Sequence, residues 1–216
     1  QLCVVAGGGV GSSGNLFGLG VAAGNAGTIT IGCTGSEEEG IGDVYGGANA
    51  ADINSDITLN ITGGKINRVF GGNNASGSIS GGIVVNVNWN TENPCGVNYL
   101  GNVYGAGNLA QYGSASSNKG NYPAVNILNG TVSGHVFGGG LGESAIVYGN
   151  PQVTIGDNNA SHTAIVTGDV YGGGDAANVV GTPVVKVVND CNTQIGNVYG
   201  GGNYGFSLGE ANIYIT

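Results

Sequence analysis

Basic residues are the scarcest group in this sequence. Four Lys and Arg stand against thirteen Asp and Glu among 216 residues, which gives a net charge of −9. Binding to nucleic acid depends on clustered Lys and Arg that neutralise phosphates. The charge balance therefore argues against a nucleic-acid partner, and the many Asn, Thr and Ser residues predict a polar surface with little charge.

The sequence also lacks long apolar runs and uninterrupted helical stretches. No segment reaches the roughly 20 apolar residues that span a bilayer, so we expect no membrane insertion. Forty-seven glycines leave few gaps for three helical turns, and each glycine weakens a helix by about 1 kcal/mol relative to alanine. We expect an all-β fold in a single repeat domain, residues 1–216.

A glycine-rich core of the form V-[YF]-G-G-G-N recurs along the chain. Most copies begin at a valine, and one degenerate copy begins at Leu16. The cores lie near residues 16–21, 44–49, 69–74, 103–108, 136–141, 170–175 and 198–203. Their spacing of about 25 to 34 residues is typical of solenoids, propellers and repeat arrays.

Short apolar stretches flank each core. Alternating runs rich in β-branched residues precede it, such as TITIG from Thr28 and ITLNIT from Ile57, and an apolar patch such as Ile53 or Ile79 follows it. One such unit cannot bury its own apolar face, but stacked units form parallel sheets around a continuous core. The sequence predicts a parallel β-solenoid of about seven coils with three short strands per coil.

Stacking of the coils would align equivalent side chains in rows. The aromatic row contains Tyr45, Phe70, Tyr104, Phe137, Tyr171 and Tyr199. Because successive strand residues point to opposite faces, the valine before each aromatic residue faces the other way. We expect the valines inside and an outward aromatic row that covers a neighbouring segment or subunit. The alternative places the aromatic side chains in the core.

The end of each glycine run predicts a tight corner. This position holds Asn49, Asn74, Asn108, Asp175 and Asn203. Gly and Asn tolerate the positive φ that a sharp corner between sheets demands. Glycines also let two backbones approach closely, because they have no side chain.

The cysteines and asparagines are compatible with an exported protein. The four cysteines lack C-x-x-C spacing, which argues against a zinc site, and their even number permits disulfides. Cys3 and Cys33 are 30 residues apart, close to one repeat, and form the candidate disulfide, whereas the pairing of Cys95 and Cys191 stays open. The candidate N-glycosylation sites are Asn74, Asn129 and Asn159.

No arrangement of residues predicts an enzyme. Parallel β-helices that cleave polysaccharides use paired carboxylates, whereas Asp43 and Asp169 fall in nonadjacent coils. His135 and His162 have no nucleophilic relay around them in sequence. We expect no cofactor. Calcium stays an open alternative because the chain is acidic, although the run Glu37 to Glu39 is more typical of a solvated loop.

The repeated G-[DN]-V-[YF]-G-G-G-[ND] signature, preceded by T-x-T-I or V-x-V strands, resembles the glycine-rich repeats of large bacterial cell-surface and adhesin-like proteins. The resemblance spans nearly the whole chain. It implies a β-solenoid stalk or fibre at the cell exterior, and it implies no catalytic residues.

Both ends of the sequence are expected to form strands with an open edge. QLCVVA stands at the start and ANIYIT at the end, without polar caps, and open strand edges recruit partners. The candidate subunit contacts are Leu2, Val4, Ile213, Tyr214 and Ile215. We hypothesise a structural subunit of an extracellular filament assembled head to tail. The alternative is a surface adhesin stalk or a module that binds surface glycans, and the third reading is a polysaccharide-active β-helix enzyme.

Overall fold

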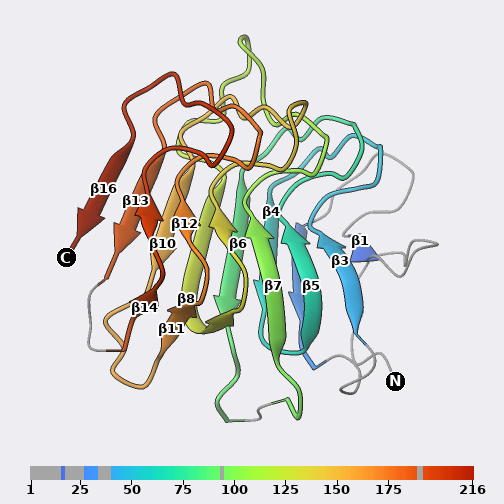
Figure 1. Ribbon diagram of the computed structural model, residues 1–216. Coiled ribbons are helices and arrows are strands. Elements are labelled where there is room, and N and C mark those ends of the chain that lie inside the picture. Colours follow the sequence, from blue (N-terminus) through green and yellow to red (C-terminus); the bar gives the residue numbers. More distant parts are fainter. Residues whose placement is uncertain (1–15, 18–26, 34–39, 93–94, 189–191) are drawn as a thin grey trace.

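The chain folds into a parallel β-solenoid. In the computed structural model, residues 16–17, 27–33, 40–92, 95–188 and 192–216 are described. Figure 1 shows the coils stacked side by side, from the blue strands β1 (Leu16–Phe17) and β3 (Ile41–Tyr45) to the red strand β16 (Asn212–Ile215). All pairings between named strands are parallel, and none of the described residues is helical.

Each coil has three sides, which we name by their typical residues. The valine side contains β1, β3, β5 (Lys65–Phe70), β7 (Tyr99–Tyr104), β9 (Val136–Phe137), β11 (Ala164–Val166), β12 (Val170–Tyr171), β14 (Gln194–Ile195) and β15 (Val198–Tyr199). The asparagine side contains β2 (Gly27–Ile31), β4 (Ile57–Ile61), β6 (Ile83–Asn88), β8 (Ala124–Val132), β10 (Gln152–Ile155), β13 (Val184–Val187) and β16. Strand β8 bends from the asparagine side to the valine side. Ala124 to Ile127 pair with β10 on the first side, and Gly130 to Val132 pair with β11 on the second.

The third side, the bridge side, is held by single parallel bridges instead of strands. Ile53 pairs with Ile79, and Tyr112, Val147 and Val179 pair in sequence from coil to coil. Ile53, Ile79, Val147 and Val179 belong to the apolar patches predicted after the cores, whereas Tyr112 was not predicted. The side chains are fully buried or nearly so, and they close the triangular core.

The register confirms the predicted repeat. One ladder of Cα partners joins the first residue of all seven cores, Leu16, Val44, Val69, Val103, Val136, Val170 and Val198. Only Leu16 and Phe17 of the first core lie within the described residues. The valines between Val44 and Val170 are fully buried, as expected.

The aromatic row was only partly predicted. Tyr45, Phe70, Tyr104, Phe137 and Tyr171 are at most 8% exposed, and they form a cluster separate from the valine core. Their rings stack at 4.7 to 4.9 Å between centroids, which is the spacing of neighbouring strands. The row therefore lies outside the valine core, as expected, and it packs against Leu141 of the same chain. Contact of the row with another subunit stays a prediction.

The glycines of the repeated cores allow the backbones of adjacent coils to approach closely, and none of those described has a positive φ. A Cβ on Gly105 would collide with the carbonyl oxygen of Gly138, and one on Gly138 would collide with that of Gly172. Among the described residues, Ala176 is the one non-glycine residue with positive φ. The positive φ predicted for Asn49, Asn74, Asn108, Asp175 and Asn203 was therefore wrong. The predicted corner is confirmed at the four asparagines, where the chain bends.

The disulfide differs from the predicted one. Cys33 is bonded to Cys95, with Cα atoms 5.1 Å apart, so the Cys3–Cys33 pairing was wrong. Cys33 follows β2, and Cys95 lies between β6 and β7, so the bond passes over the coil of β4. Gly63 of that coil lies directly beneath it, because a Cβ there would stand 2.5 Å from the Cys95 sulfur. Cys3 and Cys191 lie outside the described residues.

Candidate functional site

The last coil of the described chain exposes large apolar side chains, and three of them, Tyr199, Ile213 and Ile215, stand at positions that the preceding coil buries. Within the described residues, β15 pairs only with β12, and β16 pairs only with β13. The large exposed apolar side chains of this coil are Tyr199, Tyr204, Phe206, Leu208, Ile213, Tyr214 and Ile215. We call this surface the end face.

The end face keeps the register of the core. Ile213 pairs with Val185, which is fully buried, yet Ile213 is 43% exposed. Ile215 pairs with Val187, which is 7% exposed, yet Ile215 is 68% exposed. Both isoleucines therefore occupy inward positions that no other described strand covers.

The predicted contact residues fall in two groups. Ile213, Tyr214 and Ile215 lie together on β16. Tyr214 pairs with the exposed Lys186, so it belongs to the outer face and not to the inward row of the two isoleucines. Leu2 and Val4 lie outside the described residues.

A row of polar residues runs two positions before each aromatic ring. Asp43 begins it, and Arg68 of the next coil donates from Nε to Asp43 Oδ1 at 2.8 Å and forms an ion pair with the same carboxylate. This hydrogen bond raises the pKa of Arg68, and the guanidinium lies 5.5 Å from the centroid of the Phe70 ring. Burial, followed by the nearby charge of Asp43, raises the pKa of Tyr45. The pair fixes two neighbouring coils to each other.

The same row continues as links between side chains and backbone. Asn102 Oδ1 accepts from the His135 amide at 2.8 Å, and His135 Nδ1 accepts from the Asp169 amide at 2.9 Å. Asn197 donates its side-chain amide to Asp169 at 2.8 Å, which lowers the pKa of that carboxyl. Asn102, His135 and Asp169 thus each form a hydrogen bond with the following coil, and the row links neighbouring coils to each other.

Two ladders of side-chain amides also cross the coils. The turn ladder joins Asn74 to Asn49 at 2.8 Å and Asn108 to Asn74 at 2.9 Å. The strand ladder runs along the outer face of the asparagine side through Asn60, Asn86 and Asn126. The strand ladder was not predicted from the sequence, although ITLNI, IVVNVN and AVNIL each place Asn at an outward position.

The candidate glycosylation sites differ in accessibility. Asn129 is 6% exposed and donates its amide to the Trp89 carbonyl at 2.8 Å, so this prediction was wrong for the folded chain. Asn159 lies in an exposed loop beside His162. Asn74 is half-buried in the turn ladder. Glycosylation at Asn74 and Asn159 stays a prediction.

The described residues offer neither a cluster of metal ligands nor a membrane-spanning helix. Within the part of the chain that the structure describes, no three His, Cys, Asp or Glu side chains gather as metal ligands. Glu37 to Glu39, the run considered for calcium, lie outside that part. The described residues also form no helix with the length and apolarity to cross a membrane. No protein-family model, no curated protein and no solved structure matches this chain.

Proposed function

We propose that this chain is a structural, non-catalytic protein of the cell exterior and that its copies join head to tail into a filament. The carrying observation is the end face, where inward-facing side chains such as Ile213 and Ile215 stand 43% and 68% exposed. Burial of apolar surface contributes about 25 cal/mol per Å². An apolar coil end with an open strand edge is therefore a strong site for strand addition.

The proposed occupant of the end face is a second copy of the chain. At the opposite end, β1 and β2 hold the same rows as β15 and β16, because each pairs in unbroken register with its neighbour. Ile29 and Ile31 stand in the inward rows that end in Ile213 and Ile215. Ile29 and Ile31 are already buried, so Leu2 and Val4 are the proposed contacts through which that end of another copy would continue both rows. Because the contact is heterologous and does not close on itself, it propagates.

Two features support a place outside the cell. The Cys33–Cys95 disulfide joins coils of one chain, and disulfides persist in oxidising compartments. The resemblance of the glycine-rich repeat to bacterial surface proteins points the same way. Stacked coils rise about 4.8 Å each, so every coil would add about that length to a filament.

Electron microscopy and sedimentation of the purified chain test the proposal. We expect filaments, with a fibre-diffraction reflection at about 4.8 Å along their axis. The double variant Ile213→Lys, Ile215→Lys should stay monomeric, because it places two charges in the buried rows of the contact. Leu109→Lys is the matched control, since Leu109 is also 51% exposed but lies in an interior coil. Monomers of the unaltered chain at high concentration, or filaments of the double variant, would overturn the proposal.

A further inference from the structure

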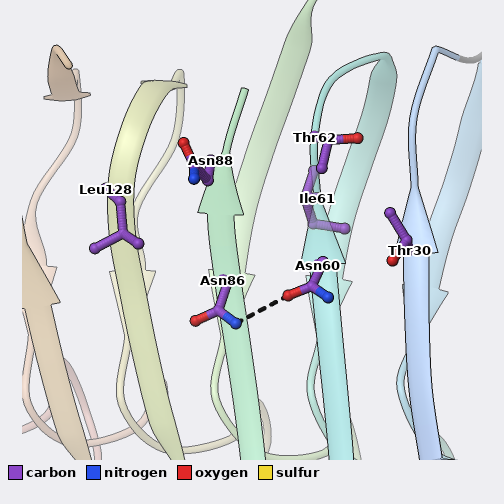
Figure 2. A pocket seen from close by; sticks show the side chains of 7 residues that line it. All are labelled: Thr30, Asn60, Ile61, Thr62, Asn86, Asn88 and Leu128. Carbon is purple, nitrogen blue, oxygen red and sulfur yellow. Dashed lines mark hydrogen bonds between the residues drawn. The ribbon is translucent and has the colours of Figure 1, made fainter. Parts of the chain in front are cut away.

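The outer face of the asparagine side carries an open hollow of about 390 Å³. Figure 2 shows its walls, which come from four neighbouring coils: Thr30, Asn60, Thr62, Asn86, Asn88 and Leu128. Small-molecule sites commonly have volumes of roughly 300–1,000 Å³. The hollow is therefore large enough for a small ligand or for part of a longer one.

The amides at the centre of the hollow are held in place before any ligand arrives. Asn86 donates from Nδ2 to Asn60 Oδ1 at 2.9 Å, and Asn126 donates in the same way to Asn86 at 2.9 Å. Figure 2 shows the first of these bonds between adjacent strands. The backbone beneath is a continuous parallel ladder. A ligand would therefore find ordered groups, and binding would lose little side-chain entropy.

These amides retain hydrogen-bonding capacity toward the hollow. A primary amide has two N–H donors and two acceptor lone pairs. The ladder engages one N–H and one lone pair of Asn86, which leaves one of each. Thr62 donates its hydroxyl to the Ile31 carbonyl at 3.0 Å, so its oxygen is left to accept. Neighbouring donors and acceptors at strand spacing suit hydroxyl groups, because each hydroxyl both donates and accepts.

The walls also define the charge and polarity of the ligand. No Asp, Glu, Lys, Arg or His is among the lining residues. A carboxylate or phosphate would lose hydration there without gaining a counter-charge, which is unfavourable. Leu128 is half-exposed beside Asn88 and offers an apolar contact for C–H groups. From these features we infer that the hollow binds a neutral oligosaccharide, with ring hydroxyls on the amides and a C–H face on Leu128.

A glycan array tests this inference with the fluorescently labelled 216-residue chain. The array carries neutral cello-, xylo-, manno- and chito-oligosaccharides and, as acidic probes, oligogalacturonate and hyaluronan fragments. We expect signal on neutral spots alone. With the strongest neutral probe in calorimetry, Asn86→Ala should raise Kd at least about tenfold, as expected for two lost hydrogen bonds.

Asn74→Ala is the matched control, because Asn74 makes the same two amide bonds in the turn ladder, away from the hollow. Its Kd should equal that of the unaltered chain. Leu128→Asp leaves the ladder untouched and should also weaken binding, so the test does not depend on one variant. Signal on acidic spots alone, no signal on any spot, or unchanged Kd in both hollow variants would overturn the inference. Repeating the titration in the Ile213→Lys, Ile215→Lys background separates sugar binding from filament assembly.

Discussion

Tyr104 and Tyr199 occupy equivalent positions in one aromatic stack, yet one is buried and the other is exposed. Tyr104 lies between Phe70 and Phe137 and is 1% exposed, whereas Tyr199 stacks on Tyr171 alone and is 46% exposed. The local sequence, V-Y-G, is the same in both coils. Burial in this fold is therefore supplied by the neighbouring coils and not by the coil itself.

Interior coils and the last coil also differ in the exposure of their inward side chains and in their covalent links. Val153 and Ile213 share a row, with exposures of 1% and 43%. Near the other end, a disulfide joins Cys33 to Cys95 and spans the coil between them. In a solenoid, stability is close to a sum of contacts between adjacent repeats. We therefore expect interior coils to be stable and the last coil to be the weakest part of the described chain.

The largest expected effect compares two truncations within the aromatic stack. Phe70→Ala should lower the free energy of unfolding by about 3–5 kcal/mol, since it removes a fully buried ring that stacks on both sides. Tyr199→Ala should lower it by about 1 kcal/mol, because that ring is half-exposed and has one stacking partner. Urea denaturation, monitored by circular dichroism in the non-assembling Ile213→Lys, Ile215→Lys background, measures both. Equal losses would contradict the contrast between interior and end coils.

The second expected effect concerns the disulfide. Replacing Cys33 and Cys95 together by Ser should lower the free energy of unfolding by about 2–4 kcal/mol, because the bond closes a long loop across a sequence separation of 62. Hydrogen exchange should show faster exchange in β2, β4 and β6 and little change in β10 and β13, where contacts are made with other coils. Uniformly faster exchange along the chain would show that the coils unfold as one unit.

The sequence predicted the stacking direction and register because a solenoid repeats one environment. Val44, Val69 and Val103 are each surrounded by the same residue types, so their similarity alone aligns the coils. The inward and outward alternation of β4 follows in the same way, with Leu59 buried and Asn60 half-exposed on the outer face. These features depend on local pattern and on the neighbouring repeat.

The wrong disulfide prediction concerns a segment that leaves the repeat, whereas the positive φ wrongly predicted at Asn49 and its equivalents concerns the repeat itself. Cys95 lies in an insertion, and only the path of that insertion over Gly63 brings it to Cys33. Cys3 was predicted as the partner because it lies about one repeat from Cys33 in sequence. That spacing carries no information about the path of an insertion. The burial of the aromatic row likewise depends on contacts beyond its own strand, such as Leu141. Ile213 and Ile215 were predicted correctly as residues of a strand with an open edge. The structure adds the exposed fraction of each, 43% and 68%.

The smallest expected effect is a pH dependence of stability that arises from the buried tyrosines of the aromatic stack, in contrast to the exposed Tyr199. Burial, and then Asp43, raises the pKa of Tyr45 above the ordinary value of about 10. Above about pH 10, the unfolded chain releases this proton while the folded chain keeps it, so the free energy of unfolding falls as pH rises, by up to about 1.4 kcal/mol per pH unit. Below about pH 10, the contribution of the neutral hydroxyl is fully present.

Tyr45→Phe removes this titration. At neutral pH the variant should be less stable by about 0.5–1.5 kcal/mol, because the hydroxyl donates to Asp43 Oδ2 at 3.3 Å. Above about pH 10 its stability should fall less steeply than that of the unaltered chain, so the two curves converge. Urea midpoints measured at intervals from neutral to alkaline pH give both slopes. Tyr104→Phe should flatten the curve in the same sense, because burial also raises the pKa of Tyr104. If the stability curves of both variants ran parallel to that of the unaltered chain, Tyr45 and Tyr104 would titrate in the folded chain as they do in the unfolded one. The rings would then reach solvent before the coils separate, which would contradict the contrast with Tyr199.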